Sequence, residues 1–123
     1  MMKIGYARVS TYEQNLSLQM DALEKADCEK IFHDQISGVK KKRPGLDEAL
    51  TYVREGDILV VWRLDRLGRS LQHLIETVTF LEERGIGFQS LQESIDTTTS
   101  GGRLIFHIFG ALADVYDNLK VQR

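Results

Sequence analysis

The 123-residue sequence has one cysteine, one proline and no long hydrophobic run. The single cysteine, Cys28, cannot form an intramolecular disulfide or a multi-thiolate metal cluster, which fits a reducing compartment. No segment approaches the roughly 18 apolar residues of a membrane span, and the first residues lack the apolar core of a signal peptide. We therefore expect a cytoplasmic protein with no membrane partner.

An excess of charge of one sign is also missing. The chain has 16 Lys and Arg against 18 Asp and Glu, a formal net charge of -2. Overall charge therefore gives no indication of nucleic-acid binding. The basic residues are nevertheless clustered, four in a row at 40–43 and three more at Arg63, Arg66 and Arg69. An average near zero can therefore conceal a basic face.

Hydrophobic periodicity predicts an α/β fold in one domain. We expect it to be a three-layer sandwich with a mostly parallel central sheet of four or five strands. The continuous apolar run 58–62 is typical of a strand that is covered on both faces. The expected strands are 3–9, 30–34, 58–62 and 86–91, and the expected helices are 15–26, 44–55, 70–84 and a long last helix from about 103, after a loop at 97–102.

The last helix is too apolar and too long for one intrachain contact. A helix over 102–121 would be about 30 Å long, whereas a domain of this size has a radius of gyration of about 14 Å. Apolar residues surround its axis almost completely, so a second partner is expected to cover part of it. The candidates for contacts in a dimer are Phe106, Ile108, Phe109 and Leu112.

Candidate catalytic side chains follow the predicted strands, where parallel sheets form their sites. Arg8 and Ser10 stand at the end of the first strand, two positions apart, and so project to the same side. A serine hydroxyl beside a guanidinium group is a candidate nucleophile for an anionic target. The alternative is that Ser10 only begins a turn.

A second candidate group follows the third strand, in the segment Asp65-Arg66-Leu67-Gly68-Arg69. Arg66 and Arg69 would share one face of a helical turn, and with Arg8 they could clamp a phosphate. Asp65 could orient these arginines or handle a proton. The alternative is a solvated charge run. Arg43, directly before Pro44, is positioned by a helix start and is a further candidate.

Other chemistries have weaker support. No glycine lies in 10–15 to form a phosphate-binding loop after the first strand. The three histidines lack metal-ligand spacing, and we expect no metal site. Trp62 could stack on a base, although a place in the core is the favoured interpretation.

Taken together, these segments resemble the catalytic domain of the small serine recombinases, the family of the resolvases and DNA invertases. The resemblance extends over about residues 3–113 and is strongest to the invertases. The segments that carry it are Gly5-Tyr6-Ala7-Arg8-Val9-Ser10-Thr11, Arg43-Pro44-Gly45-Leu46 and Leu64-Asp65-Arg66-Leu67-Gly68-Arg69-Ser70.

The resemblance implies site-specific DNA recombination through a 5′-phosphoserine intermediate, with strand exchange and religation that need neither ATP nor a cofactor. Ser10 would be the nucleophile, and Asp65 would support the arginines that hold the phosphate. Those arginines are Arg8, Arg43, Arg66 and Arg69. Gln14 and Gln19 would position the nucleophile or the DNA, and Asp34 is a further matching acidic position. Lys120 and Arg123, near the end of the last helix, would approach DNA.

The resemblance also implies partners and domain boundaries. The partners are double-stranded DNA at a recombination site, a second copy in a homodimer, a tetramer in the synaptic complex and an accessory DNA-bending protein. Residues 1–100 would form the catalytic core and 101–123 the dimerisation helix. The usual C-terminal helix-turn-helix domain does not follow, so residues 1–123 alone are expected to be inactive. The alternative function is a non-catalytic α/β dimerisation or regulatory module derived from this fold.

Overall fold

The structure, a computed structural model, describes residues 2–10, 16–36, 43–68 and 70–121, and it confirms the α/β prediction. In this part of the chain five strands form one sheet in the order β2-β1-β3-β4-β5. The strands are β1 (Lys3–Ser10), β2 (Lys30–Ile36), β3 (Ile58–Val61), β4 (Gly87–Ser90) and β5 (Ile95–Asp96). The pairs β1–β2, β1–β3 and β3–β4 are parallel, and only β4–β5 is antiparallel.

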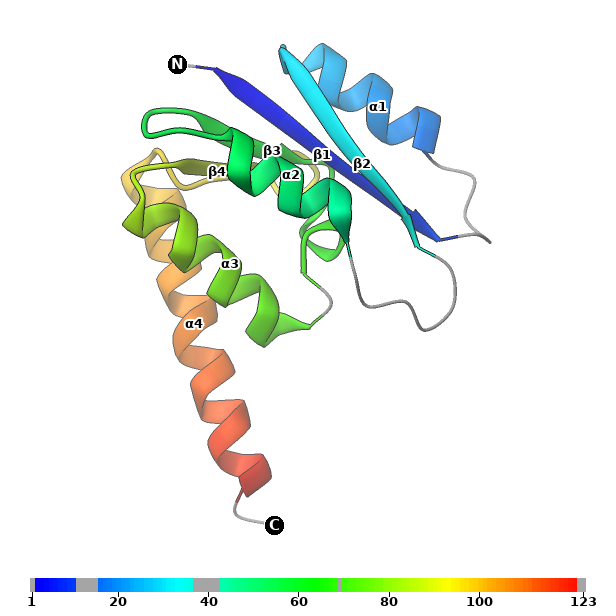
Figure 1. Cartoon of the computed structure of the whole chain (residues 1–123). Helices are drawn as coiled ribbons and strands as arrows, with labels where there is room; N and C mark the ends of the chain where they lie inside the picture. The colour runs from blue at the N-terminus through cyan, green and yellow to red at the C-terminus, as the bar shows by residue number, and fades with distance from the viewer. Residues whose placement is uncertain (1, 11–15, 37–42, 69, 122–123) are drawn as a thin grey trace.

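The helices cover both faces of this sheet, which makes the predicted three layers (Figure 1). The helical elements are α1 (Leu16–Lys25), α2 (Pro44–Tyr52), the short 3-10 turn η1 (Leu64–Arg66), α3 (Leu71–Glu83) and α4 (Ser100–Val121). Helix α1 packs on one face, where Leu23 meets Ala7 and Val60. Helices α2 and α3 cover the other face. The alternation along β1 sends Tyr6 to one layer and Ala7 to the other, as strand geometry requires.

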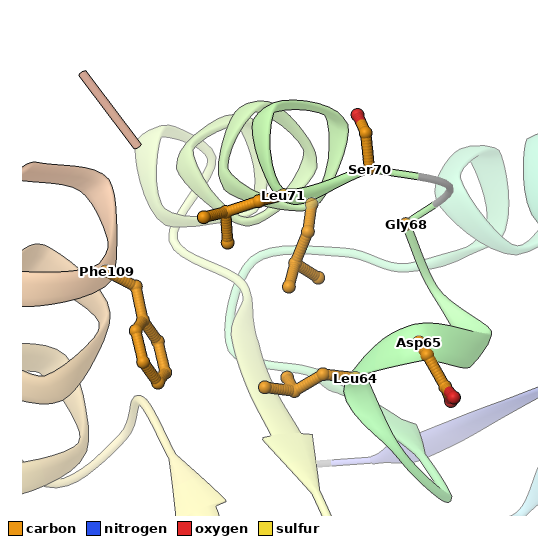
Figure 2. A pocket seen from close by; sticks show the side chains of 7 residues that line it. Leu64, Asp65, Gly68, Ser70, Leu71 and Phe109 are labelled. Atoms are coloured by element: carbon orange, nitrogen blue, oxygen red, sulfur yellow. The ribbon is translucent and has the colours of Figure 1, made fainter. Parts of the chain in front are cut away.

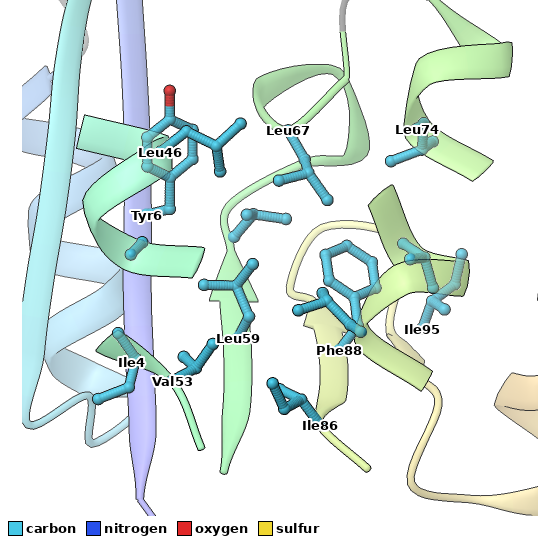
Figure 3. Packing of buried hydrophobic residues seen from close by; sticks show 14 of the residues in the cluster. Ile4, Tyr6, Leu46, Val53, Leu59, Leu67, Leu74, Ile86, Phe88 and Ile95 are labelled. Carbon is cyan, nitrogen blue, oxygen red and sulfur yellow. The ribbon is translucent and has the colours of Figure 1, made fainter. Parts of the chain in front are cut away.

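The larger of the two cores lies beneath α2 and α3 (Figure 3). Tyr6, Leu59 and Phe88 come from three neighbouring strands and are fully buried there. Leu67, which follows η1, is also fully buried and joins this core. The segment that carries Asp65 and Arg66 is therefore tied to the sheet by an apolar anchor.

The clearest differences from the sequence prediction concern the start of α4 and the short strand β5. Helix α4 begins at Ser100, inside the segment 97–102 that was expected to be a loop. Its start is supported by Thr99, whose hydroxyl accepts a hydrogen bond from the backbone N–H of Gly102 at 3.0 Å. Strand β5 has only two residues, too few for a periodic pattern to reveal.

Helix α4 packs against α3 and β5 near its start and then extends beyond them (Figure 1). Its 22 residues correspond to about 33 Å at 1.5 Å per residue. Phe106 is 4% exposed and packs edge-on against Phe88 and Phe109. This corrects the expectation that Phe106 contacts a partner, because the ring belongs to the core of its own chain.

No helix in the described ranges is long and apolar enough to cross a membrane.

Candidate active site at the carboxyl edge of the sheet

The candidate site is built where β1, β2 and β3 end, because the carboxyl ends of parallel strands share one edge of the sheet. Strand β1 persists through Ser10, so the backbone carries Arg8 and Ser10 to that edge as expected. The side chain of Ser10 lies outside the described residues. So do Gln14, Arg69 and Arg123, and also the side chain of Lys120.

Gln19 supports the backbone of β1 two residues before Ser10. The pairing of β1 with β3 ends at Tyr6, opposite Val61. Beyond this point the fully buried amide of Gln19 accepts from the Arg8 N–H at 3.1 Å and donates to the Arg8 carbonyl at 2.9 Å. A side chain thus provides both hydrogen bonds that a neighbouring strand would supply, as buried backbone groups require. Gln19 therefore holds the strand that carries the candidate nucleophile.

Two arginines distant in the sequence meet the backbone of one turn. The Nη2 group of Arg8 donates to the carbonyl of Asp65, in η1. The Nη1 group of Arg43 donates to the carbonyl of Leu67, the C-cap residue of the same turn. The structure thus brings Arg8 and Arg43 to one segment, from β1 and from the start of α2.

Arg43 is held firmly, because it is 5% exposed and also contacts α3. Its Nη2 lies 3.1 Å from Nδ1 of His73. Since a guanidinium group can only donate, Nδ1 accepts this bond when the neutral imidazole carries its proton on Nε2. His73, in turn, is placed at the start of α3 by the N-cap Ser70, whose hydroxyl accepts from the His73 N–H at 3.1 Å. Sequence reasoning missed this partner, because nothing in the spacing of His73 indicates it.

Asp34 fixes the position from which Arg43 extends. Its buried carboxylate accepts from the backbone N–H groups of Gly45 and Leu46, at 2.7 and 3.0 Å, in the first turn of α2. It also accepts from the Tyr6 hydroxyl at 2.7 Å. A carboxylate at a helix N-terminus satisfies otherwise unpaired donors and the helix dipole. Burial and the bond to Asp34 raise the pKa of Tyr6 well above its ordinary value, so its hydroxyl stays a donor.

Asp65 is the exposed acid of the site. Its Oδ1 lies 3.5 Å from the Nε atoms of both Arg63 and Arg66, and its side chain is 64% exposed. The guanidinium groups of these two arginines lie over the Trp62 ring, with their Cζ atoms 4.4 and 5.8 Å from its centroid. Trp62 itself is only 9% exposed, which agrees with its expected place in the core.

The arrangement provides a concentration of positive charge at the end of β1. Within the described residues, the buried Nε of Arg8 has no hydrogen-bond partner. Arginines bind phosphate oxygens through paired N–H donors. In the same part of the chain no group of three His, Cys, Asp or Glu side chains could hold a metal ion. Cys28 is a poor rival nucleophile, because burial raises its pKa to about 11 and the thiolate is the reactive form.

An apolar cavity of about 400 Å³ lies beside this edge, between η1, the start of α3 and α4. Figure 2 shows Leu64, Leu71 and Phe109 around it, while the carboxylate of Asp65 points away. The lining residues are Leu64, Asp65, Gly68, Ser70, Leu71, Leu74 and Phe109. Apolar side chains of η1, the start of α3 and α4 therefore face the same cavity.

The fold and the arginines define a class of protein, an α/β domain with a cluster of arginines at the carboxyl edge of its mostly parallel sheet. Residues 3–123 match the family described as Resolvase, N terminal domain. The chain belongs to this family, and the resemblance seen in the sequence is confirmed.

Known relatives and a solved structure agree with this membership. The chain is 57% identical over 122 residues to a DNA-invertase of Escherichia phage P1, covering 99% of this chain and 66% of the relative. It is 57% identical over 124 residues to the Transposon Tn552 resolvase of Staphylococcus aureus, covering 99% and 63%. The crystal structure of the N-terminal catalytic domain of TP901-1 integrase superposes with a TM-score of 0.83 at 28% identity, covering 97% of this chain and 98% of that one. The chain thus spans slightly less than two thirds of these curated relatives.

Proposed function

We propose that this chain is the catalytic domain of a site-specific DNA recombinase of the invertase or resolvase type. The observation that carries the proposal is the meeting of Arg8 and Arg43 on the carbonyls of one turn, beside the end of the strand that carries Ser10. Fixed positive charge beside the end of β1 supports a role in holding a phosphate near the serine. Membership of the resolvase family supports the same chemistry.

In the proposed reaction the Ser10 hydroxyl oxygen attacks a phosphodiester phosphorus of DNA. A bond forms between that oxygen and phosphorus, and the bond from phosphorus to the 3′ oxygen breaks. The serine loses its proton, the 3′ oxygen gains one, and a 5′-phosphoserine remains. Arg8, Arg43, Arg66 and Arg69 would stabilise the charge that develops on the phosphate, with Asp65 supporting them. The phosphoserine keeps the energy of the ester bond, so religation needs no ATP or other cofactor.

Helix α4 would form the interface of a homodimer. Among the side chains of α4 that the structure describes, five large apolar ones are 41–60% exposed, although Phe106 is buried. They are Leu104, Ile105, Ile108, Leu112 and Val115. Burying a large apolar side chain contributes roughly 1.5–3 kcal/mol, so covering several of them would stabilise a dimer considerably. The tetramer, the accessory DNA-bending protein and DNA contacts by Lys120 and Arg123 are finer parts of the same proposal.

The chemistry is tested by joining a known site-reading domain to this chain and mixing it with DNA that carries the matching crossover site. We expect a covalent protein–DNA adduct, which Ser10→Ala abolishes. Ser17→Ala, at an exposed position in α1, is the matched control and should retain the adduct. An adduct that persists with Ser10→Ala would exclude Ser10 as the nucleophile. DNA binding without any adduct would favour the non-catalytic module.

The interface is tested by sedimentation equilibrium of the chain at micromolar to millimolar concentration. We expect a dimer that Ile108→Glu dissociates. Thr79→Glu, which adds the same charge at an exposed position in α3, should leave the dimer intact. A chain that stays monomeric throughout would contradict the proposed interface. So would a dimer that Ile108→Glu does not dissociate, because its interface would lie away from this face of α4.

A further inference from the structure

The residues that follow β4 run beside the end of β3 and reach the beginning of η1. The backbone N–H of Leu91 donates to the carbonyl of Val61 at 3.0 Å, and that of Gln92 to the carbonyl of Trp62 at 2.9 Å. At the next position a side chain continues the series, because the Glu93 carboxylate accepts from the backbone N–H of Leu64 at 3.2 Å. Residues 91–93 thus form hydrogen bonds, in order along the chain, with the segment 61–64.

The Glu93 carboxylate is itself fixed to the sheet. Its second oxygen accepts a hydrogen bond from the hydroxyl of Ser90, the last residue of β4, which is fully buried. The chain turns tightly over 91–94, with Ser94 at φ 56° and its N–H donating to the Leu91 carbonyl at 3.2 Å. A carboxylate bound at both oxygens has little freedom, although Glu93 belongs to an exposed loop.

Leu64 is the first residue of η1, and the first N–H groups of a helical turn have no partner within the turn. Glu93 supplies that partner. The carbonyls of the same turn, at Asp65 and Leu67, hold the guanidinium groups of Arg8 and Arg43. A shift of the turn would therefore move both arginines together.

We propose that Glu93 is a positioning residue, which fixes η1 so that Arg8 and Arg43 face the phosphate in register with Ser10. This assignment rests on the proposed function for its catalytic meaning. Its structural part, the control of both arginines by one carboxylate, can be tested without catalysis. No sequence motif singled out Glu93.

The first measurement uses the chain alone and follows amide hydrogen exchange and the side-chain resonances of Arg8 and Arg43 by NMR. Glu93→Ala should speed the exchange of the Leu64 amide at least tenfold and shift both arginine resonances. Glu93→Gln should have little effect, because its amide oxygen can accept from Leu64 while its NH₂ group donates to Ser90. Gln92→Ala is the matched control and should resemble the unaltered chain, since Gln92 contributes a backbone bond.

The second measurement uses the fusion with a site-reading domain. Displacing reacting groups by about 1 Å can reduce a rate by about 100-fold. We expect Glu93→Ala to slow adduct formation by roughly 10- to 100-fold, to leave the Kd for DNA within twofold, and to be rescued by Glu93→Gln. A loss of DNA affinity with an unchanged adduct rate would contradict a positioning role.

The two measurements separate this inference from the proposed function. If the unaltered fusion forms no adduct, the proposed chemistry fails, and the NMR comparison still decides whether Glu93 controls the arginines. Unchanged Leu64 exchange and arginine resonances in Glu93→Ala would overturn the inference in either case. Should Glu93→Ala not fold, Glu93→Asp serves instead, because the shorter side chain cannot reach Ser90 and Leu64 together and the same shifts are expected.

Discussion

Two aspartates lie at the same edge of the sheet and differ in almost every other respect. Asp34 is 5% exposed, and its carboxylate accepts three hydrogen bonds of 2.7–3.0 Å. Asp65 has a side chain that is 64% exposed, and two arginine Nε atoms lie 3.5 Å from one of its oxygens. The buried carboxylate fixes where α2 begins and hence where Arg43 extends, whereas the exposed one can release its arginine partners to an arriving phosphate. At this edge of the sheet, the difference in burial, and not the residue type, determines that Asp34 supports the fold while Asp65 stays available to its arginine neighbours.

The largest expected effect is on the buried side of this comparison. Asp34→Ala leaves a phenol hydroxyl and two backbone N–H groups without their acceptor, and unsatisfied buried donors cost about 1–3 kcal/mol each. We expect a loss of about 3 kcal/mol or more in the free energy of unfolding, measured by urea denaturation. Asp21→Ala, at an exposed position in α1, should change it by less than about 0.5 kcal/mol. If Asp34→Ala and Asp21→Ala changed the free energy of unfolding equally, the hydrogen bonds of Asp34 would not support the fold.

Gly45→Ala tests whether the start of α2 must pack closely against the backbone of β2. A Cβ atom at this position would lie 2.2 Å from the His33 carbonyl oxygen and 2.9 Å from Oδ1 of Asp34. The start of α2 must shift, and we expect a loss of about 2–3 kcal/mol, of the size that overpacking produces. Gly101→Ala, which meets nothing within 4 Å in α4, should be neutral or stabilising. Thermal and urea unfolding of both variants would show whether the close approach at Gly45 is needed.

Tyr6→Phe removes a single donor to Asp34 and should cost about 1–2 kcal/mol at neutral pH. Because the pKa of Tyr6 is raised in the folded state, the unfolded chain releases this proton first as the pH rises. The stability that Tyr6 contributes is therefore complete below about pH 10 and is lost above it. We therefore expect the free energy of unfolding of Tyr6→Phe to fall less steeply with rising alkaline pH than that of the unaltered chain. Tyr52→Phe is the control, and an identical alkaline slope for Tyr6→Phe and the unaltered chain would contradict this account.

The smallest expected effect on stability is at Asp65. Exposed ion pairs contribute little, so Asp65→Ala should change the free energy of unfolding by less than about 0.5 kcal/mol. The same substitution should slow adduct formation in the fusion, because Arg66 loses an orienting partner. A destabilisation as large as that of Asp34→Ala would show that both carboxylates support the fold.

Local patterns in the sequence predicted most of the fold. The apolar run that became β3, the alternation in β1 and the proline at the start of α2 each report on neighbours only a few positions away. The same patterns placed Arg8 and Arg43 correctly at the ends of elements. They could not show that both arginines bind one turn, because those contacts join residues 57 and 24 positions apart.

The features that the sequence did not predict also depend on contacts between residues distant in the chain. Apolar residues surround α4 almost completely, so periodicity could not reveal that Phe106 faces Phe88 while Ile108 faces outward. Gln19 and Glu93 act through hydrogen bonds to backbone groups, which leave no trace in the hydrophobic pattern. Asp34 was recognised as a matching acidic position, but its role depends on Tyr6 and Gly45, which meet it only after folding.

The separation of these partners along the chain has a consequence for the order of folding. Contacts between distant residues form slowly, because the intervening chain must first lose its conformational freedom. Arg8 finds its acceptor 57 positions later, and the turn that provides this acceptor is braced by a carboxylate 29 positions further on. During synthesis, β1 is therefore complete long before the arginines can be set in place. The contacts of Arg8 and Arg43 with η1 can form only once η1 has been made, and the hydrogen bond from Leu64 to Glu93 only once the segment after β4 is in place.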